Sequence, residues 1–377
     1  MKFGALRETA GEESRVAVTP ETVRKFISAG HTVLVEAGAG LNSGITDAAF
    51  AEAGAEITAD SAAIAGSVDL LLCVRRPSDE VVAAMKPGTG LVGQFEPHKA
   101  EDLIAAAEKG KLILLAMEKV PRITRAQSMD ALSSQANLAG YRAVIEGAQI
   151  YGRAMPMMMT AAGTVAPAKV FIMGAGVAGL QAIATARRLG AVVTATDVRP
   201  AAKEQVASLG AKFIAVEDEE FRAAETAGGY AKEMSAEYRQ KQAELTASHI
   251  AKQDIVVTTA LIPGRPAPVL VTEEMVKTMK PGSVIVDMAV AQGGNCPLSK
   301  PDEIVDVDGV KIAGFTNLPA RIAADASALY AKNLNALIPL LTGEDGAFSP
   351  NWDDEIVAAM ALAGAPEKAG AEQGAGA

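Results

Sequence analysis

Short apolar runs alternate with amphipathic stretches along most of the chain, a pattern typical of a parallel β-sheet whose strands are connected by helices. In the first third, a helix at about residues 20–30 leads into the first of these runs. Because crossovers between parallel strands are right-handed, the alternation favours a doubly wound sheet. The strands that we predict in this region are residues 33–36, 69–74, 90–93 and 111–116.

A long stretch with helical spacing follows at residues 129–159, where small and apolar side chains recur on one face, which predicts a connecting helix. A second helical stretch at 323–341 is expected to return to the first domain. We therefore predict an α/β fold of two doubly wound, Rossmann-like domains joined by long helices, residues 1–137 with 325–377 and residues 138–324. The strands predicted in the second domain are residues 170–173, 191–196, 213–216, 255–259, 284–287 and 311–314.

The strand at 170–173 runs into a glycine-rich turn that opens a helix. Gly174, Gly176 and Gly179 form a G-x-G-x-x-G pattern with an apolar strand before it and helix-forming residues after it. Such a turn lets the backbone approach a pyrophosphate, and the helix N-terminus supplies N–H donors and a positive dipole. Asp197 ends the next strand, about 20 residues on, where dinucleotide-binding units place a ribose-binding carboxylate. The pattern predicts an NAD(H) site.

Asp197 would repel a 2′-phosphate and so favours NAD over NADP. Arg199, two residues further on, is able to bind such a phosphate, which leaves the preference open. The alternative for the whole motif is a structural glycine turn in another kind of doubly wound domain.

Residues 217–253 are too long and too highly charged for a simple crossover. Gly228, Gly229 and Tyr230 interrupt them. The interval is either a solvated helical excursion or a mobile loop near 217–245, with the glycine pair as its hinge and the Tyr230 ring covering bound nucleotide.

Composition narrows the possibilities. At 377 residues the chain is long enough for two full cores, and 49% hydrophobic with 4% aromatic residues suits a compact α/β protein. The net charge of −10 argues against a nucleic-acid partner. Cys73 and Cys296 lack metal-ligand spacing, so we predict no metal site and a reducing compartment. The first residues are too charged for a signal peptide, and no apolar run approaches the ~20 residues of a membrane span.

Few groups are suited to proton transfer. His31, His98 and His249 lie in separate regions, and no serine lies in a G-x-S-x-G turn, so we predict no hydrolytic site. Only His98 is near a predicted strand end, where a functional role is open. Dehydrogenases of alcohols and amino acids need a proton acceptor, so the scarcity of such groups matters for which hydride-transfer reaction the chain is able to catalyse.

A polar cluster at residues 121–135 follows the fourth predicted strand, at the edge where parallel sheets place ligands. Arg122 and Arg125 are candidate anion binders, Gln127 is suited to holding a carboxamide, and Asp130 to balancing a cationic ring or orienting Arg122. The alternative, compatible with the first, is a capped helix start. The candidate caps are Thr124, Ser128 and Asp130.

Several longer motifs point to one family: ESRVAVTP at 13–20, AGAG at 37–40, MKPGS at 279–283 and AQGG at 291–294. With these, nearly the whole chain resembles the alanine dehydrogenase and pyridine nucleotide transhydrogenase superfamily. Its transhydrogenase branch, the NAD(H)-binding component of proton-translocating transhydrogenase, is the closer match. The strings that carry this match lie at 121–141, 156–164 (PMMMTAAGT), 225–234 (ETAGGYAKEM) and 259–264 (TALIPG).

The departures separate the two branches. Alanine dehydrogenases use a lysine, a histidine and an aspartate around the substrate, and the matching positions here hold Arg75, Glu96 and Ala291. The family arginine is retained as Arg15, and His98 is two residues from the histidine position. A site that binds a small amino acid loses much of its affinity when the polar partners of the substrate are missing.

The resemblance implies that Arg122, Gln127, Asp130 and Ser133 hold the nicotinamide of NAD(H), and that hydride passes directly from this ring to NADP⁺ on a partner subunit. Transfer between two nicotinamides needs proximity, orientation and exclusion of water, and no proton acceptor. Gln127 is expected to hold the carboxamide, Arg122 and Asp130 to orient the ring, and Ser133 to add a hydrogen bond. The full cofactor-binding set that we predict is Arg122, Gln127, Asp130, Ser133, Gly174, Gly176, Val177, Ala178, Gly179, Asp197, Val198, Arg199, Gly229, Tyr230, Gln242, Ala260 and Leu261.

Family membership also implies a homodimer, an NADP(H)-binding partner subunit and integral membrane subunits that translocate protons. The expected location is cytoplasmic, peripheral on the cytoplasmic face of the inner membrane. The Ala/Gly-rich end, expected to be disordered from about residue 364, suggests a separately encoded peripheral subunit. The alternatives are an alanine dehydrogenase-like oxidoreductase and a non-catalytic NAD(H) sensor.

Overall fold

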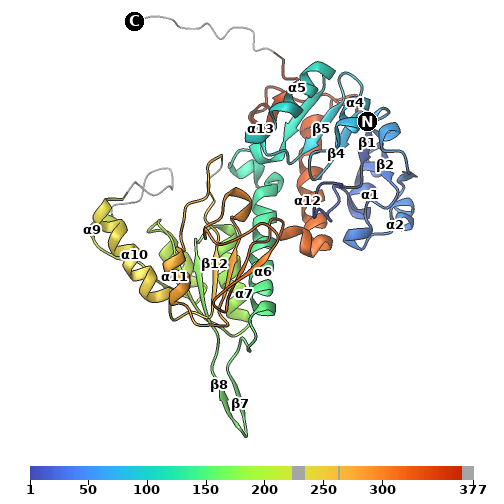
Figure 1. The fold of residues 1–377 in the computed structure, drawn as a ribbon. Coiled ribbons are helices and arrows are strands. Elements are labelled where there is room, and N and C mark those ends of the chain that lie inside the picture. Colours follow the sequence, from blue (N-terminus) through green and yellow to red (C-terminus); the bar gives the residue numbers. More distant parts are fainter. Residues whose placement is uncertain (223–233, 262–263, 367–377) are drawn as a thin grey trace, which may run out of the picture. The chain divides into compact units, whose positions relative to one another are not determined.

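The computed structural model of the protein describes residues 1–222, 234–261 and 264–366. The chain folds as two compact units (Figure 1). Unit 1 contains residues 1–135 and the chain from residue 320 onward, and unit 2 contains residues 136–319. Helix α6 (Ala131–Ile150) carries the chain from unit 1 into unit 2. The chain returns to unit 1 through the short helix η6 (Pro319–Ile322).

Unit 1 is built on a seven-stranded sheet that is parallel except at one edge, where the last strand pairs antiparallel with β6. The strand order is β16 (Ala361–Ala363), β6 (Ile113–Ala116), β5 (Gly90–Gly93), β4 (Leu70–Leu72), β1 (Lys2–Ala5), β2 (Thr32–Glu36) and β3 (Glu56–Thr58). Its helices are α1 (Pro20–Ser28), α2 (Asp47–Glu52), α3 (Ser61–Ala65), α4 (Asp79–Ala84), α5 (Glu101–Gly110), α12 (Ala323–Leu337) and α13 (Glu355–Met360).

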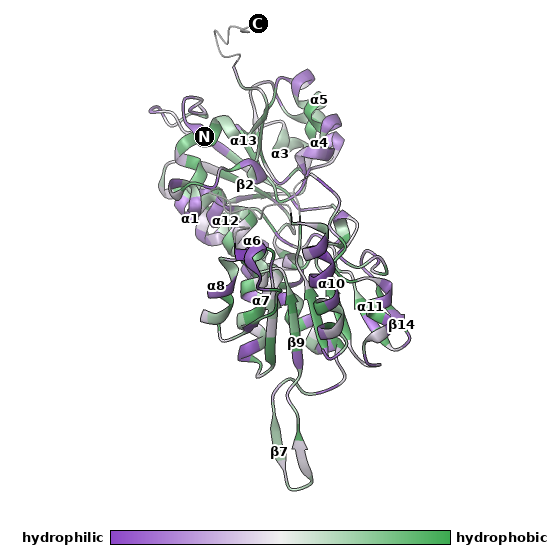
Figure 2. Ribbon diagram, turned by 90° about the vertical axis from the view of Figure 1, so that its left-hand side faces the viewer, coloured by the Kyte–Doolittle hydropathy of each residue, from purple (hydrophilic) through white to green (hydrophobic). Residues whose placement is uncertain are grey.

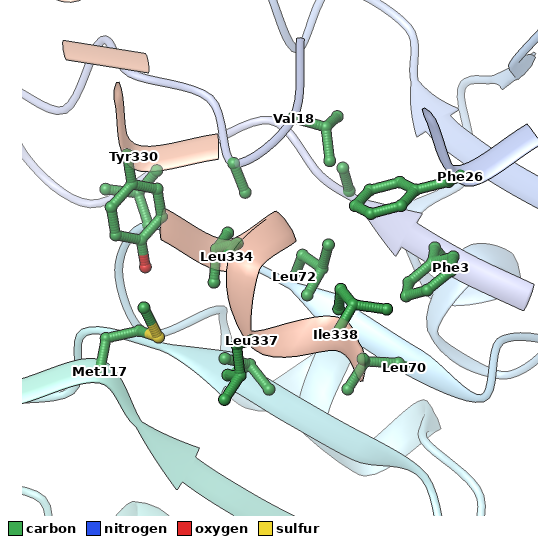
Figure 3. Close-up of a cluster of buried hydrophobic side chains, with 14 of the residues drawn as sticks. Phe3, Val18, Phe26, Leu70, Leu72, Met117, Tyr330, Leu334, Leu337 and Ile338 are labelled. Carbon is green, nitrogen blue, oxygen red and sulfur yellow. The ribbon is translucent and has the colours of Figure 1, made fainter. Parts of the chain in front are cut away.

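Both faces of the central strands of this sheet are buried, so these strands are mainly apolar. On β4, Leu70 and Leu72 pack on one face with Phe3 of β1, while Leu71 between them packs on the other. Figure 3 shows the first of these clusters, where α12 contributes side chains that include Leu334. The C-terminal segment of the chain therefore completes the core of unit 1.

Unit 2 has a second seven-stranded sheet with one antiparallel edge strand, β14. Counted along the chain from β9, its strands lie in the order 3-2-1-4-5-7-6. The first five of these follow the order of a dinucleotide-binding fold, with the switch point between β9 and β12. The order is β11 (Lys212–Phe213), β10 (Val192–Thr196), β9 (Lys169–Met173), β12 (Ile255–Thr258), β13 (Val284–Asp287), β15 (Val310–Ala313) and β14 (Ile304–Val307). Its helices besides α6 are α7 (Val177–Arg188), α8 (Ala202–Ser208), α9 (Glu219–Arg222), α10 (Ala236–Ile250) and α11 (Glu273–Thr278).

A separate hairpin of β7 (Met158–Thr160) and β8 (Gly163–Val165) extends away from the sheet of unit 2 (Figures 1 and 2). Residues 156–164 are all exposed. Within the described ranges, no helix has the length and apolar character needed to cross a membrane.

The predicted fold class is confirmed: both units are doubly wound α/β sheets. The helix predicted over 129–159 is too long, because α6 ends at Ile150 and the hairpin follows. Gly152 lies two residues beyond this end, and Pro156 prevents the helix from resuming before the hairpin, because proline and its preceding residue disfavour helix. Of the loop predicted near 217–245, residues 219–222 and 236–245 are helical, in α9 and α10.

Candidate functional site

The glycine-rich turn between β9 and α7 has a reason for each of its three glycines. Gly174 has a φ of +108°, a conformation that side chains rarely adopt. A Cβ on Gly179 would collide with the carbonyl oxygen of Gly174, so this glycine lets α7 start directly against the strand end. A Cβ on Gly176 would meet no atom within 4 Å, so the backbone there faces open space.

Gly176 is also the N-cap residue of α7 and provides no side-chain cap. The N–H groups of the first helical turn, which belong to Val177, Ala178 and Gly179, are therefore available to an anion. Open space beside a bare helix N-terminus fits a pyrophosphate, as the sequence pattern predicts.

Asp197 follows β10 and lies beside this turn. Its Oδ2 accepts a hydrogen bond from the Ala175 amide at 2.7 Å, so the carboxylate helps to fix the turn. Arg199 binds both of its oxygens, from Nε at 2.9 Å and from Nη2 at 2.9 Å. Burial would raise the pKa of Asp197, but the hydrogen bonds from Arg199 and Ala175 outweigh it and leave the pKa below its ordinary value.

Three of the predicted positions in unit 2 carry large apolar side chains that are exposed. Val177 is 42% exposed, Val198 65% and Leu261 49%. Val177 is the first residue of α7, Val198 follows Asp197, and Leu261 lies three residues beyond the end of β12. Apolar surface at these points is suited to contact with the flat faces of a nucleotide.

The side-chain amide of Gln242 on α10 makes two hydrogen bonds within unit 2. Its Oε1 accepts from the Val216 amide at 2.9 Å, and its Nε2 donates to Thr196 Oγ1 at 3.4 Å. Thr196 is the last residue of β10, so Gln242 fixes the strand end that carries Asp197. Gly229 and Tyr230, predicted to form a lid, lie outside the described residues.

The end of β12 is held by residues that sequence reasoning missed. Asn295, fully buried, accepts from the Ala260 amide at 3.1 Å and donates to the Ala260 carbonyl at 2.9 Å. The side chain of Asp287 at the end of β13 accepts a hydrogen bond from the backbone amide of Asn295 at 3.1 Å. In the sequence, Asp287 could be noticed as an acidic residue at the end of an apolar strand, but nothing there indicates that Asn295 is its partner. These bonds set the backbone that leads to Leu261.

In unit 1, residues 121–130 form a loop with a 3-10 helix, η4 (Thr124–Met129). Ala126 and Met129 are buried three residues apart, which is the spacing of one face of a 3-10 helix. Arg122 and Gln127 are exposed. The loop is therefore packed against the core on one face and presents these two side chains on the other.

Asp130 precedes α6 and caps it. Its Oδ1 accepts from the Ser133 amide at 2.8 Å, and its Oδ2 accepts from Ser133 Oγ at 2.5 Å. The capped helix start is therefore present, with Asp130 as the cap among the three candidates. Asp130 and Ser133, predicted to serve together, are in direct contact. Arg125 is instead paired with Asp354.

Two known protein domains match the chain along nearly its whole length. The alanine dehydrogenase/PNT N-terminal domain matches residues 4–139, and the alanine dehydrogenase/PNT C-terminal domain matches residues 143–366. The chain belongs to the alanine dehydrogenase/PNT family.

Within the alanine dehydrogenase/PNT family, the chain is similar to an NAD(P) transhydrogenase subunit alpha of Rhodospirillum rubrum, with 56% identity over 95% of this chain and 94% of the relative. The crystal structure of transhydrogenase from Sinorhizobium meliloti has 55% identity and a TM-score of 0.88, covering 96% of this chain and 98% of that one. An alanine dehydrogenase of Methanococcus maripaludis is 31% identical over 86% of this chain and 82% of its own length. The predicted family is confirmed.

Arg15, Arg75 and Glu96, three of the positions compared above with alanine dehydrogenases, lie in a cluster of ion pairs in unit 1. Arg15 is 2% exposed, and Glu13 binds its guanidinium twice, at 2.7 and 2.6 Å. Gln135 accepts from Arg15 Nη1 at 2.8 Å, and Arg75 Nε also donates to Glu13, at 3.2 Å. Glu96 is exposed and lies 3.9 Å from Arg75. The cationic groups here are thus matched by carboxylates of the same unit.

Proposed function

We propose that this chain is the NAD(H)-binding subunit of a proton-translocating transhydrogenase. In this proposal, hydride passes directly between NAD(H) on this chain and NADP(H) on a separate partner subunit. The observation that carries it is the loop at 121–130, which presents Arg122 and Gln127 from a backbone packed on the core. A carboxamide-binding side chain on a fixed backbone suits a reaction that depends on orientation.

Unit 2 is proposed as the NAD(H)-binding domain and unit 1 as the N-terminal domain expected from the sequence. The glycine turn would hold the pyrophosphate through the first amides of α7, and Asp197 would accept from the adenosine ribose. Exposed Val198 and Leu261 would contact the nucleotide on its apolar faces, beside Ala260. Bound NAD(H) supplies the hydride donor or acceptor carbon of its nicotinamide ring.

Each residue of the loop in unit 1 has one proposed task. Gln127 would hold the carboxamide and thereby fix which face of the ring is presented. Arg122 and Asp130 would set the ring orientation, and Ser133, already bonded to Asp130, would add a hydrogen bond. Since hydride moves between two nicotinamides, the chain has to bind, orient and exclude water, and it has no proton to remove.

The paired state of Arg15 supports this reaction over amino-acid oxidation. A substrate carboxylate at Arg15 would compete with Glu13 for the same guanidinium, and Ala291 offers no polar partner for an amine. The two alternatives are alanine dehydrogenase activity and NAD(H) sensing without catalysis. The experiment described below distinguishes both from the proposed function.

We propose that the chain acts as a homodimer beside integral membrane subunits on the cytoplasmic face of the inner membrane, and that these partners carry the protons. The β7–β8 hairpin supports the homodimer. Met157, Met158 and Met159 are 58%, 43% and 77% exposed, and residues 154–168 contain no charged side chain. An uncharged, apolar two-stranded hairpin is marginally stable alone and is prone to pair with other chains, so a partner surface would stabilise it.

The deciding experiment measures NADH oxidation with an NADP⁺ analogue whose reduced form absorbs at its own wavelength, with and without the NADP(H)-binding subunit. Transfer that requires this subunit is expected. Tight NADH binding without transfer to a competent partner would favour the sensor, and NADH oxidation with pyruvate and ammonia would favour the dehydrogenase.

A further inference from the structure

One buried amide connects the loop at 121–130 to the start of α6. Asn333 on α12 is 7% exposed. Its Nδ2 donates to the Ser128 carbonyl at 2.8 Å, and its Oδ1 accepts from Ser134 Oγ at 2.7 Å. The two bonded residues stand on either side of Asp130, so Asn333 spans the turn where the loop becomes a helix.

A second connection holds the same loop from the other direction. Arg125 donates to both carboxylate oxygens of Asp354, at 2.6 and 3.1 Å. Asp354 is itself fixed, because it is the N-cap residue of α13 and accepts from the Ile356 amide at 2.9 Å. Bidentate pairs of this kind restrict geometry as well as adding energy.

Between these two attachments, the underside of the loop is packed. Ala126 and Met129 belong to the core cluster that includes Leu334 and Leu337 of α12. The backbone of the loop is thus fixed by a buried amide, an ion pair and apolar packing, while Gln127 remains exposed on its outer side. All three attachments come from the chain beyond residue 322.

We propose that Asn333 is a positioning residue for hydride transfer, a role that rests on the proposed function above. It fixes the backbone between Gln127 and Asp130, so that the side chains assigned to the nicotinamide keep one orientation. A side-chain amide suits this place, because it donates to the Ser128 carbonyl and also accepts from the Ser134 hydroxyl, whose other acceptor is the Ala131 carbonyl at 3.2 Å. Displacement of a reacting ring by about 1 Å costs on the order of 100-fold in rate.

The test is Asn333→Asp, which keeps the size and the acceptor but removes the donor to Ser128. Asn335→Asp, two residues along α12 and only half-buried, is the matched control. We expect Asn333→Asp to lower single-turnover hydride transfer to the partner subunit by about 10- to 100-fold, with NADH affinity within about threefold of the wild type. The control should retain wild-type transfer.

Two further measurements separate positioning from a general loss of structure. Hydrogen exchange should become faster in residues 121–135 of Asn333→Asp and stay unchanged elsewhere in unit 1, with a melting temperature lowered by only a few degrees, because one buried hydrogen bond is lost. Unchanged transfer would overturn the proposal, and so would faster exchange across all of unit 1. If the wild-type chain gives no transfer, the proposed function fails, and local exchange alone decides whether Asn333 fixes the loop.

Discussion

The carboxylate of Asp197 is bound by Arg199 at both oxygens, and it accepts four hydrogen bonds when the Arg199 and Ala175 amides are included. A carboxylate offers about four lone-pair positions, so all of them are taken. A ribose hydroxyl that donates to Asp197 must therefore displace one of these bonds, and the side chain of Arg199 is the partner that is able to leave.

This relationship predicts the effect of Arg199→Ala on nucleotide choice. With Asp197 freed, NADH gains an unoccupied acceptor, while the uncompensated carboxylate repels the 2′-phosphate of NADPH more strongly. We expect the ratio of NADH to NADPH affinity to rise by about 3- to 10-fold, which corresponds to one hydrogen bond. Fluorescence titration of both nucleotides measures it, and a ratio that falls would show that Arg199 serves NADH binding directly.

Two glycines of the turn should separate binding from stability. Gly176→Ala places a methyl group in open space, so we expect the melting temperature to stay unchanged while NADH affinity falls, because the group obstructs the pyrophosphate. Gly179→Ala forces a methyl group onto the Gly174 carbonyl and should destabilise unit 2 by about 1–3 kcal/mol. Thermal melts and NADH titrations of both variants check this, and equal stability of the two would contradict the packing role of Gly179.

Gln127→Asn should affect the reaction more than the fold. The side chain is exposed, so we expect no change in unfolding free energy. The shorter side chain withdraws the amide from the carboxamide of the nicotinamide, and hydride transfer should fall by about 10-fold or more. Single-turnover transfer with the partner subunit is the measurement, and wild-type transfer in this variant would remove Gln127 from the site.

Glu8 should make the stability of unit 1 depend on pH. Burial raises its pKa from 4.5 to about 7, against the lowering effect of hydrogen bonds from the Val74 and Arg75 amides. An acid whose pKa is raised by folding contributes stability that is full below about pH 4.5 and is lost as the pH rises through about 7. The loss for this one group is about 3 kcal/mol.

Urea unfolding at pH 5 and pH 8 measures this effect, with Glu8→Gln as the comparison. We expect the wild type to lose stability between these values relative to Glu8→Gln, whose side chain does not titrate. The comparison cancels the contributions of other groups, such as His249, whose pKa is lowered by burial. Parallel pH profiles for the two proteins would rule out Glu8 as the titrating group.

The hairpin should control the oligomeric state. Met159→Asp places a charge on the most exposed of its three methionines, and we expect it to dissociate the proposed homodimer while each unit keeps its melting temperature. Leu41→Asp, at an apolar position 60% exposed in unit 1, is the control and should remain dimeric. Sedimentation velocity distinguishes the two states, and a dimeric Met159→Asp would move the interface away from the hairpin.

The inner strands of both sheets could be predicted because burial on two faces makes them continuous apolar runs, as at residues 70–72 and 255–258. Edge strands carry no such signal: β16 is an Ala-Leu-Ala segment whose strand character comes from pairing with β6, far away in sequence. The glycine-rich turn could also be predicted, because its three glycines lie within six consecutive residues. The helix predicted over 129–159 was too long because the methionines at 155 and 157–159 continue the apolar pattern beyond Ile150, where the chain forms the hairpin instead.

The candidate site was predicted only where its chemistry is local. The polar loop at 121–130 and Asp197 stood out from motif and spacing, but their partners did not. Asn333 is 205 residues from Ser128, and Asp354 is 229 residues from Arg125. Such contacts depend on the folded core of unit 1 and leave no pattern in the sequence on either side.

The discontinuity of unit 1 has a consequence for synthesis on the ribosome. Unit 2 is one continuous segment and is able to fold as soon as residue 319 has emerged, because domains fold as units during translation. Residues 1–135 must wait with an incomplete sheet until α12, α13 and β16 are made. The apolar face that α12 will cover is exposed during this interval, so the nascent chain is most vulnerable to aggregation, and most dependent on chaperones, until α12 has emerged.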